Sequence, residues 1–293
     1  MKNRTVVFGL LLIGVLIASC SFNKSASVDF MTGISTKGDG LSVDDIYLSD
    51  DKKRLETTEF EYGKKFYLNF NDIIGFKKEN GAVFPGMEFI VLTKENDTVM
   101  YNKDLYSGQT GSGFKLSPIA LNSNLIVANP IKSNEEYSLI CKIWDKKGEG
   151  TFKTEMDFNV IPNPKITIEN NGLSANEVYL SSITNNRVIT NEIITFDEKV
   201  QIVVEGLNGF TEKNGQTELD LSMKLVDANG NVLSENTNLL GDSSINVNMV
   251  RQAVSSYFTL TKGRLKNPVT CHVEITDKIS GSKMSINTEL TVE

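Results

Sequence analysis

The sequence has very few of the residues on which most enzyme and metal sites depend. Its 293 residues include one histidine, His272, together with three cysteines and one tryptophan. A single imidazole excludes a site built from several histidines, and a Ser-His-Asp site would need His272 as its base. The chain contains no Gly-x-Ser-x-Gly, His-Glu-x-x-His, phosphate-loop or dinucleotide-binding pattern. We therefore expect no catalytic residues, no metal site and no cofactor, and we predict that the protein is not an enzyme.

The cysteines are too few to form a disulfide framework. Cys141 and Cys271 lie one in each half of the chain, and both sit among apolar residues at alternate positions. This pattern favours two small, buried hydrophobic side chains. A disulfide between them would need Cα atoms within about 7 Å of each other, so we expect none.

Basic residues are fewer than acidic residues. Lys and Arg number 30 against 37 Asp and Glu, which gives a formal net charge of −7. Affinity for nucleic acid comes mainly from basic side chains that contact phosphates. An acidic chain without a basic cluster therefore predicts no nucleic-acid partner, and it would be repelled by anionic lipid head groups.

The N-terminus has the pattern of an export signal. Lys2 and Arg4 precede an apolar stretch at residues 6–17, and two small residues then lead to Cys20. The stretch is shorter than the roughly 20 residues that span a bilayer. The small-small-Cys ending resembles the lipobox of bacterial lipoproteins. The resemblance implies that Cys20 is lipidated, becomes the new N-terminus and anchors the protein in a membrane; the alternative is an ordinary signal peptide.

The residues after Cys20 bear on the location of the protein. Residues 21–25 contain no Asp beside Cys20 and no acidic run. In the Gram-negative sorting scheme, the lipoprotein resemblance then implies transfer to the outer membrane, facing the periplasm. Exposure on the cell surface is the alternative.

The chain repeats itself with an offset of 132 residues. Residues 40–49 (GLSVDDIYLS) match residues 172–181 (GLSANEVYLS), and Asp145 matches Asp277. A shared Gly-Phe-x-x-x-Asn-Gly motif, with the offset moved by two, begins at Gly75 and at Gly209. Matches at both ends and in the middle predict two copies of one domain.

The predicted boundaries follow from this repeat. We expect a signal peptide at residues 1–19, the lipidated Cys and a polar tether at 20–27, and two domains at 28–161 and 162–293. Two prolines in residues 161–164 mark the boundary, because proline cannot continue a central strand. So short a linker should restrict motion between the domains, and the short tether should keep the first domain close to the membrane.

Each copy has the pattern of antiparallel β-structure. Residues 65–70 alternate between polar and apolar side chains, and residues 199–204 keep their apolar side chains at the same parity. Turn residues recur every 8–12 positions, which favours a sandwich. The last hairpin of each half turns at an Asp: residues 137–144 lead through Asp145 into 151–160, and residues 269–276 lead through Asp277 into 283–292. These closing hairpins resemble those of bacterial immunoglobulin-like domains. The predicted fold is all-β, with two tandem immunoglobulin-like sandwiches, and only residues 248–254 favour a helical turn or two.

Two repeated or turn-like segments have a structural and a functional interpretation. Residues 227–231 carry oxygen side chains at alternate positions, as in a calcium loop, but a hairpin turn is favoured because Asn-Gly is a preferred turn pair. Phe76 and Phe210 would be exposed anchors in a binding protein. We favour the alternative, in which each closes the open end of its sandwich.

Aromatic residues that occur in one copy only are the best indication of a binding surface. Trp144 has the parity of the outer face, and its counterpart is Thr276. Tyr101 and Tyr106 belong to a stretch whose counterpart, residues 233–240, has no aromatic residue. Because Trp and Tyr are enriched at interfaces, these three residues are the candidate ligand or partner surface. The alternative for Trp144 is packing under a loop or the neighbouring domain.

Three functional hypotheses follow. The first is a non-enzymatic envelope lipoprotein that binds a protein partner or acts as a structural spacer. The second is a glycan-binding accessory lipoprotein of an outer-membrane uptake system, which predicts an exposed row of aromatic residues around Trp144. The third is a carboxylate-based hydrolase, which predicts two acidic side chains converging in a cleft.

Overall fold

The computed structural model describes residues 24–109, 111–115, 117–263 and 265–293. The predicted signal peptide and Cys20 lie outside the described residues. Within these ranges, regular structure is β-strand apart from a 3-10 turn, η1 (Ser107–Gln109), and one α-helix, α1 (Val247–Gln252). The helix lies where the sequence favoured a helical turn. None of the helices in the described ranges has the length and apolar character needed to cross a membrane.

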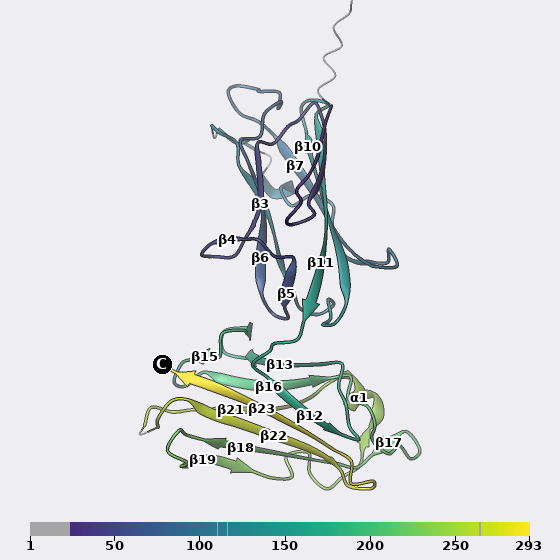
Figure 1. The fold of residues 1–293 in the computed structure, drawn as a ribbon, viewed down its shortest axis with the longest axis vertical. Helices are drawn as coiled ribbons and strands as arrows, with labels where there is room; N and C mark the ends of the chain where they lie inside the picture. Colours follow the sequence, from purple (N-terminus) through teal and green to yellow (C-terminus); the bar gives the residue numbers. More distant parts are fainter. Residues whose placement is uncertain (1–23, 110, 116, 264) are drawn as a thin grey trace, which may run out of the picture.

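The first half of the chain forms a sandwich of two sheets (Figure 1). One sheet has the order β1-β2-β11-β10-β7-β8, with β5 parallel to β11, and the other has the order β4-β3-β6-β9. The strands are β1 (Lys24–Val28), β2 (Ser35–Asp39), β3 (Asp45–Ser49), β4 (Arg54–Leu55), β5 (Glu59–Glu61), β6 (Lys65–Asn71), β7 (Pro85–Thr93), β8 (Thr98–Asn102), β9 (Leu121–Ile126), β10 (Glu136–Asp145) and β11 (Thr151–Ile161).

The second half repeats this topology from β2 onward. Its sheets have the orders β12-β23-β22-β18-β19, with β15 parallel to β23, and β14-β13-β16-β21; β17 and β20 form a separate pair. The strands are β12 (Thr167–Asn171), β13 (Glu177–Ser182), β14 (Arg187–Ile189), β15 (Ile193–Ile194), β16 (Lys199–Glu205), β17 (Gln216–Thr217), β18 (Leu219–Val226), β19 (Val232–Asn236), β20 (Ile245–Asn246), β21 (Val254–Thr259), β22 (Val269–Asp277) and β23 (Lys283–Val292). The predicted fold, two tandem immunoglobulin-like sandwiches, is confirmed.

Part of the predicted tether is instead a strand. Residues 24–28 pair antiparallel with β2, and all five side chains of β1 are exposed. The strand is held by its backbone ladder and by a 2.9 Å hydrogen bond between the hydroxyls of Ser27 and Thr36. Because neither face of β1 is buried, its sequence lacks the alternation that marks a half-buried strand.

Each sandwich has its own hydrophobic core, and each core contains one of the predicted buried cysteines. Cys141 lies opposite Phe89 in the first core, and Cys271 lies opposite Leu225 in the second. Both thiols are free, so no disulfide joins them.

The two buried thiols should be unreactive in the native protein. Burial raises the pKa of each thiol to about 12, so almost no thiolate exists at neutral pH. We expect a thiol reagent to label neither Cys141 nor Cys271 at pH 8, and to label both after denaturation. Labelling of one of them in the native state at the rate of a free thiol would contradict the burial described here.

The repeated Gly-Phe-x-x-x-Asn-Gly motif forms the same tight turn at one end of each sandwich. Asn80 and Gly81 have positive φ values of 51° and 76°, and Asn214 and Gly215 have values of 54° and 73°. Two consecutive residues with positive φ are the signature of the type I′ turn that Asn-Gly favours. The half-buried rings of Phe76 and Phe210 pack against their own cores, as we expected.

A buried aspartate in each closing hairpin holds this loop in place. Asp145 accepts a 2.6 Å hydrogen bond from the backbone N–H of Lys77. Its counterpart Asp277 accepts 2.7 Å bonds from the N–H and the hydroxyl of Thr211, and a 2.6 Å bond from the Ser280 hydroxyl. The repeated Asp is therefore a structural residue in both copies.

The pKa of Asp277 gives a testable acid sensitivity. Burial alone would raise this pKa, but hydrogen bonds, chiefly from Ser280 and Thr211, outweigh it and lower the pKa to about 2. Because the folded pKa is depressed, the stabilisation is present above the ordinary value of 3.8 and is lost as pH falls toward 2. We expect Asp277→Asn to lower the free energy of unfolding by about 2–3 kcal/mol at pH 7. Between pH 4 and pH 2, the unfolding free energy of this variant should decrease less than that of the parent protein.

Denaturant titrations at several pH values measure both effects. Asp242→Asn is the matched control. The Asp242 side chain is 92% exposed, and it lies at the same end of the sandwich as Asp277, with its Oδ1 atom 3.7 Å from Nζ of Lys278. This control should leave the unfolding free energy unchanged. An equal loss in the two variants would show that the Asp277 hydrogen bonds contribute no net stability.

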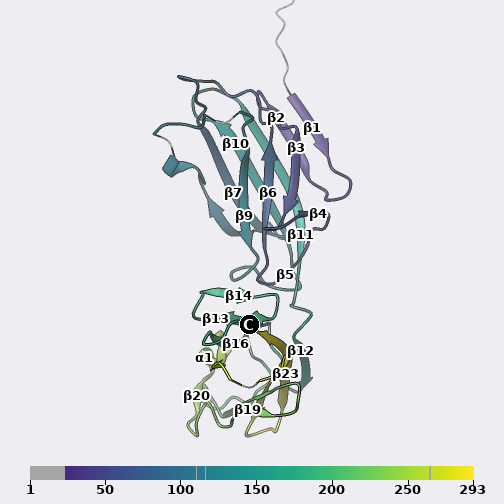
Figure 2. The same cartoon turned by 90° about the vertical axis from the view of Figure 1, so that its left-hand side faces the viewer.

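The second sandwich lies beyond one end of the first, and it presents a side of its own sandwich, with β13 and β14, to that end (Figures 1 and 2). The strands of the first run along the long axis of the molecule, whereas those of the second run across it (Figures 1 and 2). The chain passes between them through the short segment from Ile161 to Thr167. The strand β1 begins at the end of the first sandwich that is remote from the second (Figure 2).

Candidate functional site

A buried polar contact clamps the two sandwiches together. The backbone N–H of Ser133, in the first sandwich, donates to Glu177 Oε2 at 2.9 Å, and its hydroxyl donates to Glu177 Oε1 at 3.0 Å. Glu177, at the start of β13, is only 5% exposed. Beside it the rings of Tyr62 and Tyr179 lie 5.2 Å apart, centroid to centroid. These contacts fix how the second sandwich sits on the first.

The pKa of the Glu177 carboxyl group is raised above its ordinary value. Burial raises the pKa of Glu177, and the nearby Glu205 carboxylate adds to the rise, while the hydrogen bonds from Ser133 oppose it. Glu205 lies opposite Glu177 in the β13–β16 pair and accepts a 2.8 Å hydrogen bond from the Tyr179 hydroxyl. These two acidic residues therefore belong to the interface between the sandwiches.

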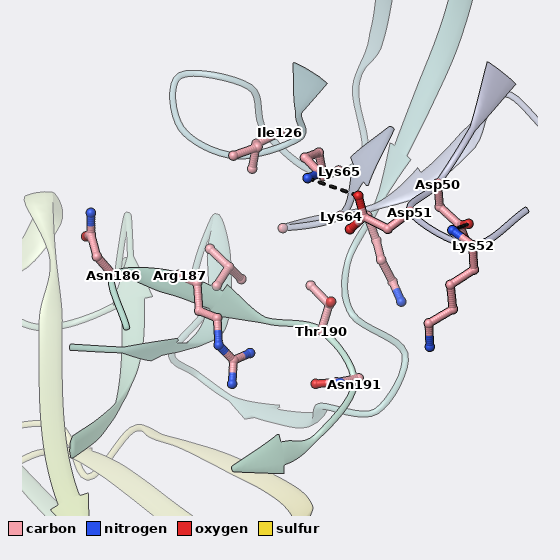
Figure 3. A pocket seen from close by; sticks show the side chains of 12 residues that line it. Asp50, Asp51, Lys52, Lys64, Lys65, Ile126, Asn186, Arg187, Thr190 and Asn191 are labelled. Carbon is pink, nitrogen blue, oxygen red and sulfur yellow. Dashed lines mark hydrogen bonds and ion pairs between the residues drawn. The ribbon is translucent and has the colours of Figure 1, made fainter. Parts of the chain in front are cut away.

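Next to the clamp, a cleft of about 570 Å³ opens between the sandwiches (Figure 3). The first sandwich contributes the turn after β3 (residues 50–52), residues 63–65 and Ile126, and the second contributes residues 186–191. A Cβ atom on Gly63 would overlap Val188 and lie 2.8 Å from Thr190 Cγ2. The two sandwiches are thus in direct contact along the cleft, and only glycine allows this approach.

Cationic side chains outnumber anionic ones in the cleft. Its lining contains four cations and two carboxylates: Lys52, Lys64, Lys65, Arg187, Asp50 and Asp51. Asp51 is already engaged, because it pairs with Lys65 at 3.1 Å and accepts a 2.8 Å hydrogen bond from the Tyr67 hydroxyl. Lys64 pairs with Glu61 at 3.4 Å, just outside the lining. Arg187 is also paired, with Glu198 at 3.3 Å. Its guanidinium and the exposed Lys52 are the cationic groups of the lining considered below.

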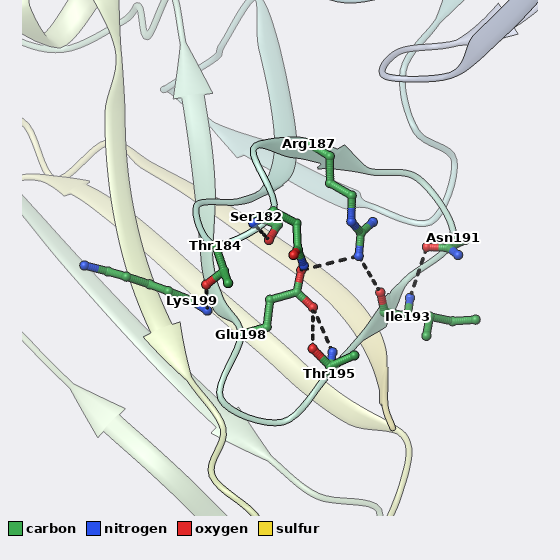
Figure 4. A network of polar contacts seen from close by, with 9 residues as sticks. Ser182, Thr184, Arg187, Asn191, Ile193, Thr195, Glu198 and Lys199 are labelled. Carbon is green, nitrogen blue, oxygen red and sulfur yellow. Dashed lines mark hydrogen bonds and ion pairs between the residues drawn. The ribbon is translucent and has the colours of Figure 1, made fainter.

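Arg187 is held in place by a buried carboxylate (Figure 4). Its Nη2 atom donates to Glu198 Oε1 at 3.3 Å and to the Ile193 carbonyl at 3.4 Å. Glu198 also accepts a 2.8 Å bond from the Thr195 N–H and a 2.8 Å bond from Asn185 Nδ2. Together these contacts tie the β13–β14 turn to the segment that precedes β16.

Glu198 remains ionised although its side chain is fully buried. Burial would raise its pKa, but hydrogen bonds from Ser182, Thr195 and Asn185 outweigh that effect and lower the pKa to about 2. A buried carboxylate with a fixed orientation also fixes the guanidinium that pairs with it. Arg187 is consequently a pre-oriented cation at the edge of the cleft.

The predicted aromatic surface lies elsewhere, on the first sandwich. Trp144 is half-buried on the outer face of β10, the face that its parity predicted, and it lies opposite Gly86 on β7. A Cβ atom on Gly86 would overlap the indole ring and lie 2.7 Å from its Nε1. The ring thus lies flat against the glycine backbone and covers it.

Tyr101 and Tyr106 do not join Trp144 in one row. Tyr101 is 57% exposed and lies opposite Ile90, four positions along β7 from Gly86, which is about 13 Å at the usual strand rise. Tyr106 is half-buried, and its hydroxyl donates to the Asn122 carbonyl at 2.9 Å, on the other sheet. The structure therefore separates the three residues and gives Tyr106 a packing contact between the sheets.

The remaining candidate loops have structural partners. The Asp227 carboxylate accepts bonds of 2.9 Å from the N–H groups of Asn229 and Asn231 and closes the β18–β19 hairpin turn. His272 is half-buried and its Nδ1 lies 2.7 Å from Asn287 Oδ1. Across the described ranges, no group of three or more His, Cys, Asp or Glu residues is placed to hold a metal ion.

No sequence pattern predicted the cleft. One wall comes from residues 50–52, residues 63–65 and Ile126, and the other comes from residues 186–191 of the second sandwich. None of these segments carries a recognisable motif. The only relevant signal was the short linker, which predicted restricted motion between the domains. A charge count over the whole chain concealed the local excess of cations, because the chain is acidic overall.

Comparisons with known proteins add little to this geometry. No protein-family model and no curated protein matches the sequence. Among solved structures, the chain is similar to the C-terminal domain of wzt, with a TM-score of 0.31 and 10% identity over 44% of this chain and 79% of that one. It is also similar to a DUF3823 family protein from Bacteroides ovatus, with a TM-score of 0.24 and 12% identity over 74% of this chain and 95% of that one.

A third similar structure is dimeric latent PorU from Porphyromonas gingivalis, with a TM-score of 0.25 and 10% identity. The match covers 86% of this chain but only 20% of PorU. Values this low say nothing about function. The assignment to immunoglobulin-like sandwiches rests on the sheet orders described above.

Proposed function

We propose that the chain is a non-enzymatic envelope lipoprotein, a stiff two-domain module that binds a protein partner or acts as a spacer. The observation that carries this proposal is the clamp between Glu177 and Ser133, because it joins two sandwiches into one elongated body. A buried contact of this kind is unnecessary for two domains that act independently. Inter-domain contacts within a chain otherwise permit relative motion.

The position of β1 supports the anchor. Cys20 precedes Lys24, the first residue of β1, by four residues, which span at most about 14 Å. Since β1 begins at the end of the first sandwich remote from the second (Figure 2), lipidation at Cys20 would hold the first sandwich near the membrane and project the second away from it. The outer membrane, with the protein facing the periplasm, is the proposed location.

Two experiments test the anchor and the location. Cells that express the protein are labelled with radioactive palmitate; we expect label in the wild type and in Cys141→Ala, but none in Cys20→Ala. Label retained in Cys20→Ala would exclude this anchor. Protease added to intact cells should leave the second sandwich undigested until the outer membrane is permeabilised, whereas digestion in intact cells would place the protein on the surface.

A further inference from the structure

We propose that the cleft between the sandwiches binds an anionic saccharide, through a carboxylate or phosphate group held by Arg187, with Lys52 on the opposite wall adding positive charge. This inference goes beyond the proposed function because it names a ligand class, and it does not depend on the lipid anchor or on a protein partner. The outer aromatic residues of the first sandwich have no part in it.

Arg187 is the primary anion contact. Both of its protein hydrogen bonds use Nη2, and within the described ranges the guanidinium makes no other. The N–H groups of Nη1 and Nε are therefore left to a ligand. Because Glu198 already fixes the guanidinium plane, little side-chain entropy is lost when an oxyanion binds. Guanidinium also matches the geometry of carboxylate and phosphate oxygens.

The other wall supplies a second cation. Lys52 is exposed at the turn after β3, and Lys64 lies at the turn between β5 and β6, so the first sandwich contributes lysines to the wall opposite the one that contains Arg187 (Figure 3). Asp50, the second carboxylate of the lining, accepts backbone bonds of 2.8 Å and 2.7 Å from Lys52 and Lys53. Its charge is partly satisfied by these N–H groups.

The uncharged lining suits a sugar. Thr190 and Asn191 offer a hydroxyl and an amide for ring hydroxyls, while Ile126 and Val188 offer small apolar surfaces for ring C–H groups. A volume of about 570 Å³ is in the range of small-ligand sites and accommodates a few sugar rings. The described residues that line the cleft include no aromatic side chain, so a neutral sugar would lack the stacking contact on which its affinity would depend.

The net charge of the chain argues against a long polyanion. At −7 overall, the protein repels an extended polyphosphate such as nucleic acid at every point outside the cleft. A short anionic saccharide meets mainly the charges that line the cleft, in which four cations stand against two carboxylates. Binding should weaken as ionic strength rises, since both cations are partly exposed to solvent.

Titration calorimetry on the full protein in a non-ionic detergent tests the proposal. Three probes are used at low ionic strength: tetragalacturonate as a carboxylate, glucose 6-phosphate as a phosphate, and cellotetraose as a neutral saccharide. We expect saturable binding of at least one anionic probe and none of cellotetraose. Binding of tetragalacturonate alone would assign a uronate, and binding of both would assign a general sugar-anion site.

Matched variants separate the cleft from overall charge. Arg187→Met should weaken the anionic probe at least about tenfold, the effect of losing one charge-assisted hydrogen bond. Arg251→Met makes the same charge change at a 49% exposed arginine that pairs with Glu212 at 2.9 Å in another part of the same sandwich, and it should change affinity less than about twofold.

A second cleft variant is needed because Arg187→Met could weaken binding through misfolding. Arg187→Met leaves Glu198 without its cation, so Lys52→Met, at an exposed side chain, is measured alongside and should also weaken binding several-fold. Equal losses in Arg187→Met and Arg251→Met, equal affinity for cellotetraose, or the absence of saturable binding by both anionic probes would each overturn the proposal.

Discussion

Replacement of Gly75 by alanine is expected to destabilise the first sandwich by about 3 kcal/mol or more, through backbone overlap and a left-handed conformation. Gly75 has φ +102°, and a Cβ atom there would overlap the Gly40 carbonyl oxygen and lie 3.2 Å from Leu41 Cα. Both neighbours are backbone atoms, so no side-chain rotation relieves the overlap. The bridge between Ser42 and Ile74, with hydrogen bonds of 3.2 Å and 3.0 Å, holds these segments together.

Gly81→Ala is the control for the backbone conformation alone. Gly81 has φ +76°, but no atom lies within 4 Å of the position that its Cβ would occupy. We expect this variant to cost only about 1 kcal/mol, the penalty for a left-handed alanine. Urea titration of both variants gives the comparison. Similar losses in the two variants would show that the loop moves away from Gly40 and that the close approach contributes little.

The second sandwich contains the same contact, so the experiment can be repeated within one molecule. A Cβ atom on Gly209 would overlap the Gly172 carbonyl oxygen and lie 3.3 Å from Leu173 Cα. Gly209→Ala should therefore destabilise the second sandwich by a similar amount. The overlap explains why glycine occupies position 75 and its counterpart 209, while Gly40 and Gly172 have the positive φ values of 78° and 91° that favour glycine.

Replacement of Glu177 by leucine is expected to release the two sandwiches from each other. Leucine leaves the Ser133 N–H and hydroxyl without their acceptors in a buried interface, a cost of about 1–3 kcal/mol. Distances between spin labels at Lys94 and Lys224, both replaced by cysteine and one in each sandwich, should be narrowly distributed in the parent and broad in Glu177→Leu. A narrow distribution in both would show that the tyrosine pair and the linker suffice to fix the arrangement.

Glu177→Gln, in contrast to Glu177→Leu, is expected to keep the two sandwiches together, and it tests the effect of the raised pKa of Glu177. A raised folded pKa means that the protonated form is favoured by folding, so this contribution is fully present below the ordinary value of 4.5 and is lost as pH rises through the raised value. The interface should therefore strengthen as pH falls from 7 toward 4.5. Glutamine mimics the protonated acid and should remove this dependence while keeping the narrow distance distribution.

The clamp also connects the two proposals. The cleft has one wall on each sandwich, so its shape exists only while Glu177 holds them together. Glu177→Leu should weaken the anionic saccharide without touching a residue of the cleft. This variant therefore distinguishes a site made by both sandwiches from one made by Arg187 alone.

The fold class followed from local patterns because each pattern reports on burial at single positions. Alternation in residues 65–70 and 199–204 correctly identified half-buried strands, β6 and β16. The apolar neighbours of Cys141 and Cys271 correctly placed both in cores. The strand β1 was missed for the same reason, since a strand exposed on both faces leaves no such pattern.

The sequence by itself determined the duplication, the β-sandwich fold, the buried thiols and the Asn-Gly turns, because these depend on local backbone preference and on alternation between core and solvent. Only the tertiary structure decided which surface is a site. It separated Trp144, Tyr101 and Tyr106, and it brought Lys52 and Arg187 together across two sandwiches. The physical reason is that the cleft depends on how two folded bodies pack. Contacts between side chains far apart in the sequence, such as Glu177 with Ser133 and Tyr62 with Tyr179, contribute to that packing, and no local pattern predicts them.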